Sequence, residues 1–185
     1  MIAARPMRVM ASAAAVLIAL LSTQVQAREE TMTSTPQAPQ VAKDQLALLA
    51  SPDPALAANK RLVYDMYRVV LQAGRADRAR EFIATDYIQH NPNAAQGLAG
   101  LVDYVRSTRP ERPILDTITL PLIHIMAEGD RVVIAFVRPE KDPKGETYYT
   151  TWFDMFRIAN GKIAEHWDPM LRTDAKIDPN DKTLK

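Results

Sequence analysis

The sequence predicts an α+β domain in which helices come first and a mainly antiparallel sheet follows. An apolar stripe at three- and four-residue spacing runs from 58 to 73, and four β-rich segments separated by turn residues follow between 118 and 170. Pro121 fits only a strand edge or a bulge, so the first of these strands should bend. Helices laid on one face of a strongly curved sheet would enclose a cone-shaped interior.

Three helices are expected before the sheet. The first begins with Asp53 as N-cap and Pro54 in the first helical position, where a missing N–H costs nothing, and Gly74 ends it. The second helix is short and covers about 75–83, and the third covers about 98–107. No strand is predicted among these helices.

Turn signals divide the rest of the chain into strands. The predicted strands are 118–126, 131–138, 147–158 and 162–170. The turn Asn160-Gly161 supplies the left-handed backbone angles of a tight hairpin, so the last two strands should pair.

The first 27 residues have the pattern of a secretory signal peptide. Arg5 and Arg8 precede an apolar run at 11–21, and Val25-Gln26-Ala27 fits a small-residue cleavage signal. The apolar run is too short to span a bilayer comfortably. We therefore expect a periplasmic or secreted protein with no membrane association after cleavage.

Composition narrows the function classes. Cleavage would leave 158 of the 185 residues and change the net charge from +1 to −1, which gives no footprint for nucleic acid. The absence of cysteine excludes disulfides and thiol chemistry. The predicted organisation is a flexible leader over 28–52, one domain over 53–172 and a tail over 173–185.

Several fragments occur in a characteristic order: Tyr87-Ile88-Gln89-His90-Asn91-Pro92, Ala127-Glu128-Gly129-Asp130-Arg131-Val132, Phe153-Asp154-Met155-Phe156-Arg157, Gly161-Lys162-Ile163 and Glu165-His166-Trp167-Asp168. Together they resemble the SnoaL-like branch of the nuclear-transport-factor-2-like superfamily, over about 54–170. The resemblance implies a cone-shaped α+β barrel, often dimeric, with an apolar pocket between sheet and helices. It also implies acid–base chemistry by a carboxylate, without metal or cofactor, as in polyketide cyclases that close a ring by aldol condensation.

Asp168 is the candidate base, because it matches the family's aspartate in the last strand. The alternative is a carboxylate that caps the strand end before Pro169 or forms an ion pair. His166 lies two residues away and therefore on the same strand face, so it is a candidate donor or orienting group. A half-buried histidine that ties strand to helix is the alternative. Glu165 faces the other way.

Asp154 joins this pair only in one hairpin register. A two-residue loop would place Met155 opposite His166 and turn Asp154 away. A three-residue loop with Gly161 as a bulge would pair Asp154 with His166, and Trp152 with Asp168. Because glycine commonly takes the left-handed position of such loops, we favour the second register and include Asp154 among the catalytic candidates.

Candidate substrate contacts come from one loop and from the aromatic residues. The loop residues are Gln89, His90 and Asn91, although Asn91 could simply start the turn and His90 could cap a helix. The aromatic candidates are Trp152, Phe156 and Trp167, as core or pocket lining. No metal site is expected, because the three histidines are widely spaced.

Two functions follow. The first is a cofactor-independent lyase or isomerase that acts on a small hydrophobic carbonyl compound. The second is a non-catalytic exported protein that binds a hydrophobic small molecule in the same pocket. Export argues against a true polyketide cyclase, whose substrates arise in the cytoplasm. A homodimer formed through one face of the sheet is expected in either case.

Overall fold

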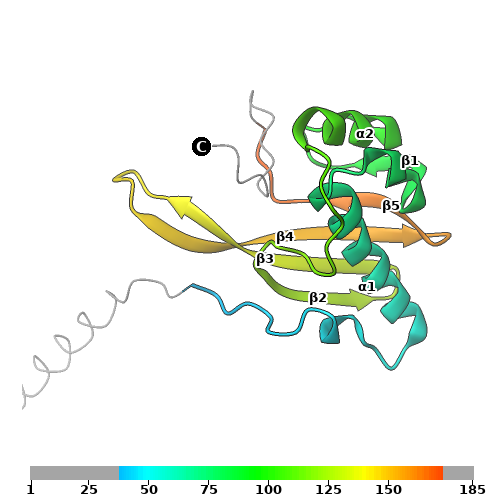
Figure 1. Ribbon diagram of the computed structural model, residues 1–185, viewed down its shortest axis with the longest axis horizontal. Coiled ribbons are helices and arrows are strands. Elements are labelled where there is room, and N and C mark those ends of the chain that lie inside the picture. Colours follow the sequence, from blue (N-terminus) through cyan, green and yellow to red (C-terminus); the bar gives the residue numbers. More distant parts are fainter. Residues whose placement is uncertain (1–37, 173–185) are drawn as a thin grey trace, which may run out of the picture. The chain divides into compact units, whose positions relative to one another are not determined.

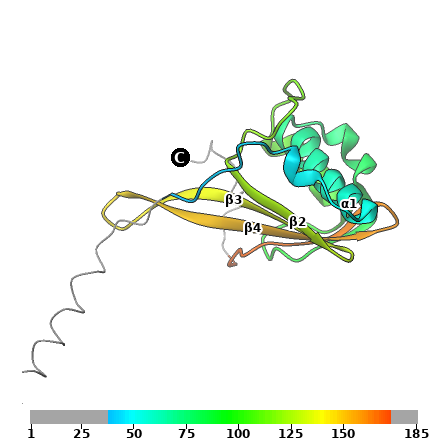
Figure 2. The same ribbon diagram turned by 90° about the horizontal axis from the view of Figure 1, so that it is seen from below.

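The computed structural model describes residues 38–172, which form an open, curved, five-stranded sheet with helices on one face (Figures 1 and 2). The predicted signal peptide, the first part of the leader and the tail from 173 lie outside the described residues. Within 38–172, no helix combines the length and the apolar character needed to cross a membrane. The predicted α+β class is confirmed, and closure into a barrel stays a prediction.

The sheet contains one parallel pair among antiparallel pairs. The strands are β1 (Ile83–Gln89), β2 (Leu122–Glu128), β3 (Arg131–Lys141), β4 (Thr147–Ala159) and β5 (Lys162–Trp167). Their order is β1-β5-β4-β3-β2, with β1 and β5 parallel and the other neighbours antiparallel. The last strand of the chain therefore lies between the first strand and the central hairpin.

The main helix begins where the sequence predicts. In α1 (Pro54–Met66) the Asp53 carboxylate accepts a hydrogen bond of 2.8 Å from the backbone N–H of Ala55 and so caps the first turn. The helix continues as a π-helical segment, η3 (Tyr67–Gln72). A 3₁₀ helix, η4 (Ala76–Glu81), and α2 (Gly97–Thr108) follow.

Strand β1 contradicts the prediction that three helices precede any strand. The second predicted helix shortens to the 3₁₀ turn η4, and the chain then enters β1 before it reaches α2. Only three residue pairs connect β1 to β5, with a register shift between them. A short, irregular strand whose partner lies about 80 residues away has no local pattern that reveals it.

The irregularity expected near Pro121 is present. Leu122 pairs with Phe136 and His124 pairs with Ala135, so Ile123 is an extra residue that forms a β-bulge. The Pro121 carbonyl accepts a hydrogen bond of 2.9 Å from the Val137 N–H. The first antiparallel strand therefore begins four residues later than predicted.

The closing hairpin has a two-residue loop rather than the three-residue loop that we favoured. Asn160 and Gly161 both have positive φ, 52° and 69°, and Ala159 pairs with Lys162 across them. The bulge lies further along β5, where Ala164 is the extra residue between Ile163 and Glu165.

This bulge at Ala164 has the effect that was predicted for Gly161. It shifts the pairing by one residue, so that Phe156 lies opposite His166 and Met155 lies opposite Trp167. Asp154 thereby shares a face with His166 and Asp168. The predicted pairings of Asp154 with His166 and of Trp152 with Asp168 are wrong, although the face on which these residues lie is as expected.

The core lies between α1 with η3 and the inner face of the sheet. Fully buried helix residues such as Val63, Tyr64 and Val70 belong to one cluster with Ile134 and Phe136 of the sheet. Burying such side chains contributes roughly 1.5–3 kcal/mol each. The core thus fixes where η3 crosses the sheet.

Part of the predicted leader belongs to the folded unit. The Lys60 ammonium donates hydrogen bonds of 2.6 Å to the carbonyls of Leu48 and Ala50. The Gln45 side chain accepts a hydrogen bond of 2.6 Å from the Tyr64 hydroxyl. The boundary predicted at Asp53 therefore falls inside the packed structure.

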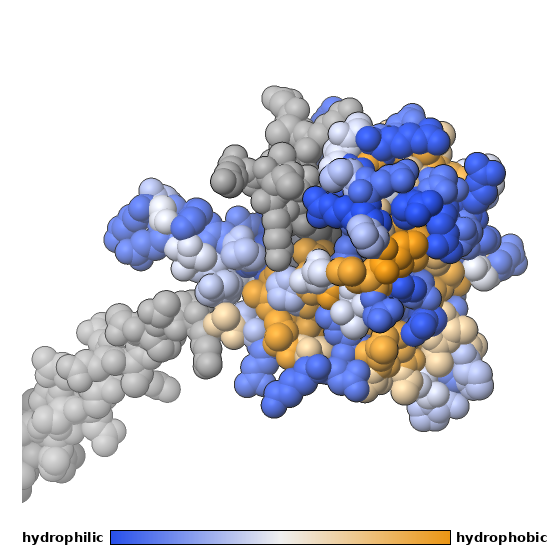
Figure 3. Space-filling view, in the orientation of Figure 1, coloured by the Kyte–Doolittle hydropathy of each residue, from blue (hydrophilic) through white to orange (hydrophobic). Residues whose placement is uncertain are grey.

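Strands β3 and β4 continue past the other strands as a two-stranded arm (Figure 1). Pairing extends to Lys141 and Thr147, and the turn at the tip is held by Asp142, which accepts hydrogen bonds from two backbone N–H groups. The end of the arm is mostly hydrophilic (Figure 3).

Gly74 and Gly161 allow a matched test of backbone geometry. Both have positive φ, 68° and 69°, but a Cβ at Gly74 would lie 2.6 Å from the Pro110 carbonyl oxygen, whereas nothing lies within 4 Å at Gly161. Gly161→Ala is expected to cost about 1–2 kcal/mol of unfolding free energy from backbone strain alone. Gly74→Ala should cost at least about twice that in urea unfolding, and equal losses would contradict the close approach.

Candidate functional site

A cavity of about 480 Å³ is lined from the sheet, η3 and α2. Its apolar lining includes Met66, Leu71, Ile83, Leu101 and Phe156. Its polar groups are Tyr67, Tyr87, Gln89, Asn91, Asp154, His166 and Asp168 among others. A largely apolar cavity with a few convergent polar groups is the usual form of a small-molecule site.

Asp154 is the most deeply buried acid of the site, with 2% of its surface exposed. Its Oδ1 accepts a hydrogen bond of 2.9 Å from the Trp152 indole N–H, and its Oδ2 accepts one from the Tyr67 hydroxyl. The Nε2 of His166 lies 3.1 Å from Oδ1. A buried carboxyl group is tolerated only with such partners.

Hydrogen bonds define the tautomer of His166. Its Nδ1 lies 3.0 Å from Gln89 Oε1, and this oxygen also accepts a hydrogen bond of 3.0 Å from the Asn91 backbone N–H. A backbone N–H can only donate, so the Gln89 atom facing it is the oxygen, and His166 Nδ1 must carry a hydrogen. The ring is stacked on Phe156, with centroids 4.7 Å apart.

It follows that one proton lies between His166 Nε2 and Asp154 Oδ1. Without that proton, the lone pair of the ring nitrogen would face the carboxylate directly. With it, the two side chains form a pair of zero net charge, either as imidazolium with carboxylate or as imidazole with carboxylic acid. Asp154 and His166 therefore act as one unit.

Asp168 follows the last residue of β5 and is half-buried. Its Oδ2 accepts a hydrogen bond of 2.7 Å from Asn91 Nδ2, and its Oδ1 accepts one of 3.2 Å from the Met170 N–H. The orientation of the Asn91 amide is fixed, because its Oδ1 accepts a hydrogen bond of 2.8 Å from the Asn93 N–H. The orientation of the Asp168 carboxylate is thus fixed by one hydrogen bond to each of its oxygens.

The two acids differ in how many further hydrogen bonds they can accept. A carboxylate has about four lone-pair positions, and Asp154 uses three of them on Trp152, Tyr67 and His166. Asp168 uses two, and it is also the more accessible of the two acids. Asp168 is therefore better placed to take a proton from a bound molecule.

Asp154, His166 and Asp168 offer atoms that all lie within 4.8 Å of one another. The spacing of the histidines in the sequence did not reveal this group, which combines one histidine with two acids. Both ring nitrogens of His166 are already in hydrogen bonds, to Asp154 and to Gln89. The arrangement is that of a proton network, and a metal ion here would have to displace the bond to Asp154 or the bond to Gln89.

Two predicted substrate contacts lie elsewhere. Trp167 is opposite Met155 in the pairing and so faces the outer side of the sheet, where His90 stacks on it with centroids 4.5 Å apart. Neither residue lines the cavity. The prediction for His90 and Trp167 is corrected for one reason: each is next to a cavity residue, Gln89 or His166, at the end of β1 or β5, and successive side chains there point to opposite faces.

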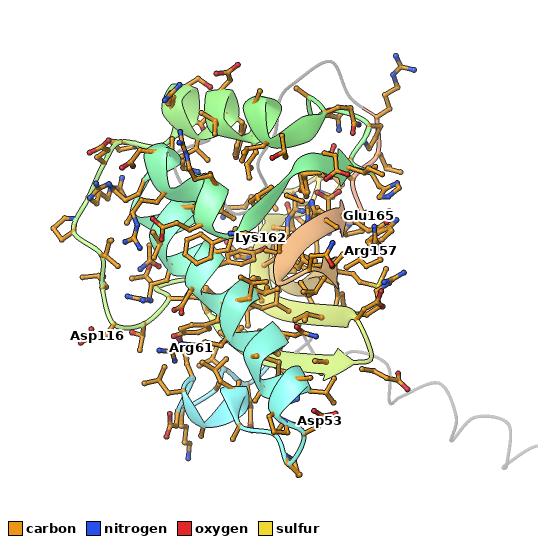
Figure 4. All side chains as sticks on the ribbon, turned by 90° about the vertical axis from the view of Figure 1, so that its right-hand side faces the viewer. Asp53, Arg61, Asp116, Arg157, Lys162 and Glu165 are labelled. Carbon is orange, nitrogen blue, oxygen red and sulfur yellow. The ribbon has the colours of Figure 1, made fainter. Side chains whose placement is uncertain are left out.

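Glu165 lies on this outer face, as predicted. It accepts a hydrogen bond of 2.5 Å from Arg157 Nε and lies 2.8 Å from His90 Nε2; Figure 4 shows Arg157 and Glu165 beside each other. His90 and then Arg157 lower the pKa of the Glu165 carboxyl. This cluster is separate from the cavity.

The other predicted residues stand in or beside the site. Phe156, Gln89 and Asn91 line the cavity, with Gln89 and Asn91 bonded to His166 and Asp168. Trp152 does not line it, but its indole N–H holds Asp154, and Arg138 lies over its ring at 4.4 Å. Their roles toward a substrate stay predictions.

Two tyrosines of the site, Tyr67 and Tyr87, were not predicted from the sequence. Both line the cavity, and burial raises the pKa of each well above the usual value. Tyr67 is four residues after Val63 and three before Val70, so its place on the buried helix face was readable. Tyr87 could not be found without the strand β1 that carries it.

Comparison with known proteins gives one family model and several similar solved structures. The SnoaL-like domain model matches residues 63–166. Among solved structures, TsrD from Streptomyces laurentii is 21% identical, with 64% of this chain and 90% of that chain covered and a TM-score of 0.44. An LEH-like epoxide hydrolase from M. tuberculosis is 15% identical, with 62% and 84% covered and a TM-score of 0.46.

A candidate polyketide cyclase from Acidithiobacillus ferrooxidans is 18% identical, with 64% and 89% covered and a TM-score of 0.45. No curated protein matches the sequence. The assignment rests on the family model, which spans more than half of the chain and includes Asp154 and His166. The chain belongs to the SnoaL-like domain family.

Proposed function

We propose that this protein is a cofactor-independent lyase or isomerase that performs acid–base chemistry on a small hydrophobic carbonyl compound. One observation carries the proposal: Asp154, His166 and Asp168 converge within 4.8 Å on a largely apolar cavity, each oriented by further hydrogen bonds. Membership of the SnoaL-like family supports it, since the resemblance implies a carboxylate acid–base.

In the proposed reaction, Asp168 removes a proton from the carbon next to the carbonyl group. The C–H bond breaks, its electron pair forms the enolate, and the proton goes to the carboxylate. The same proton then returns to another carbon in an isomerisation. In an aldol step, the enolate carbon attacks a second carbonyl carbon, and the alkoxide formed there takes the proton from Asp168. Neither route consumes an external reactant.

The Asp154–His166 pair makes this assignment electrostatically reasonable. Two carboxylates a few ångströms apart would repel each other if both carried a charge. Because Asp154 and His166 share a proton and form a pair of zero net charge, Asp168 can carry its negative charge without repulsion from a second net charge. The site thus contains the two groups that proton abstraction needs, one ionised base and a fixed polar neighbour.

A solvent exchange experiment tests the proposal without knowledge of the product. Apolar ketones and aldehydes are incubated with the protein in D₂O, and deuterium uptake next to the carbonyl is followed by NMR and mass spectrometry. At least one compound should exchange faster with protein than without it. Leu101→Trp, which fills the cavity from α2, should abolish the exchange, while Arg106→Trp on an exposed position of α2 should not.

The alternative function gives a different result. If the protein only binds a hydrophobic molecule, compounds will raise its melting temperature and Leu101→Trp will remove that effect, but no compound will exchange. That outcome would replace the enzyme proposal by the binding-protein proposal.

Export and a homodimer remain proposals. The outer face of the sheet would suit a second copy of the chain, because it exposes large apolar side chains, with Phe153 50% and Met126 48% exposed. The cavity is formed on the other face, so a dimer of this kind would leave its lining unchanged.

A further inference from the structure

We infer that the hydroxyl group of Tyr87 donates the hydrogen bond that stabilises the negative charge on the substrate oxygen. The inference rests on the proposed function and adds a catalytic residue to it. Tyr87 lines the cavity from β1 with 4% of its surface exposed.

The hydrogen bonds of Gln89 leave the Tyr87 proton available. Gln89 Oε1 faces the Asn91 N–H, so Nε2 is the other amide atom, and it donates a hydrogen bond of 3.1 Å to the Tyr87 oxygen. The Tyr87 oxygen is therefore an acceptor in this contact. Its own hydrogen must point elsewhere, and no residue between 38 and 172 is found to accept it.

Tyr67 cannot take the same role. Its hydroxyl hydrogen is used in the bond to the buried Asp154 carboxyl group. Of these two buried tyrosines, Tyr87 alone combines a place on the cavity wall with a hydrogen that is free to bind a ligand.

One short segment holds both the base and the donor. Gln89 binds the Tyr87 hydroxyl and the Asn91 N–H, and the Asn91 side chain binds Asp168. The distance between the proton acceptor and the oxygen-binding group is therefore set by three alternate residues of one five-residue segment, Tyr87, Gln89 and Asn91. Fixed polar groups aimed at a developing charge need no reorganisation during the reaction.

The charge state of Tyr87 is suited to donation. Burial and then the nearby Asp154 and Asp168 raise the pKa of its hydroxyl well above the usual value. The group stays protonated at neutral pH and acts as a hydrogen-bond donor, not as a base. No proton transfer from it is required, since the enolate oxygen becomes a neutral carbonyl oxygen again when the enolate carbon takes a proton or bonds to a second carbonyl carbon.

Tyr87→Phe tests this inference in the deuterium exchange assay. Removal of an oxyanion donor is expected to reduce the exchange rate by about 10²–10³-fold, while the melting-temperature shift given by the same carbonyl compound stays nearly unchanged. Tyr64→Phe is the matched control, because it removes a buried hydroxyl that is bound to Gln45 outside the cavity. The control should exchange at the wild-type rate.

A second measurement tests the donor even if the wild-type protein shows no exchange. The probe is 4-nitrophenol, whose ionised form presents an oxyanion on an apolar ring and absorbs visible light. Wild-type protein should bind the ionised form at least about tenfold more tightly than the Tyr87→Phe variant does. Equal affinities would overturn the assignment of Tyr87, whereas absence of exchange by wild-type protein with unequal affinities would overturn only the proposed reaction.

Discussion

Asp168→Asn is expected to lower the deuterium exchange rate by about 10²–10⁴-fold, the usual contribution of a general base. The amide has nearly the same shape as the carboxyl group, and its oxygen can still accept the hydrogen bond that Asn91 donates. It cannot take up a proton from carbon. The measurement is the exchange rate at saturating ligand, together with the melting temperature, which should change little.

Glu165→Gln is the matched control for this variant. Glu165 lies on β5, three residues before Asp168 in the chain, but on the outer face, bound to Arg157 and His90. The same loss of charge there should leave the exchange rate unchanged. An Asp168→Asn protein that exchanges at the wild-type rate would show that Asp168 is not the base. Asp154 would then be the next candidate.

Asp154→Ala is expected to cost roughly 3–5 kcal/mol of unfolding free energy, the largest stability loss that we predict for a polar residue. The substitution removes the acceptor for the Tyr67 hydroxyl, the Trp152 indole N–H and the shared proton of His166. Each buried donor left without a partner costs about 1–3 kcal/mol. Urea unfolding at neutral pH measures the loss.

Two comparisons separate this effect from simple truncation. Asp116→Ala, at an exposed position, should change stability by less than about 0.5 kcal/mol. When Tyr67→Phe is added to Asp154→Ala, it should restore about 1 kcal/mol or more, because it removes one unpaired buried hydroxyl. An Asp154→Ala loss below about 1 kcal/mol would contradict the network described above.

Local sequence patterns were sufficient to predict part of the fold and part of the candidate site. The N-cap at Asp53, the start of α1 and the Asn160-Gly161 turn each depend on neighbouring residues, and all three were predicted. His166 and Asp168 share a face because side chains alternate along a strand, whatever the partner strand does. Those features need no knowledge of distant contacts.

Other features depend on residues far apart in the chain. The bulge at Ala164 sets the register of β5 against β4, and an alanine at this position does not predict a bulge. The contact between Tyr67 and Asp154 joins residues 87 positions apart. Strand β1 exists because β5 offers it a parallel edge, and its own sequence does not alternate clearly.

The sequence by itself therefore determined the family, the α+β class and the pair His166 and Asp168, since these follow from order, composition and periodicity. Only the tertiary structure decided that Asp154 joins this pair, that His90 and Trp167 lie outside the cavity, and that Tyr67 and Tyr87 lie within it. The physical reason is that a one-residue shift in strand pairing exchanges the two faces of a sheet, and such a shift is set by packing across the whole domain.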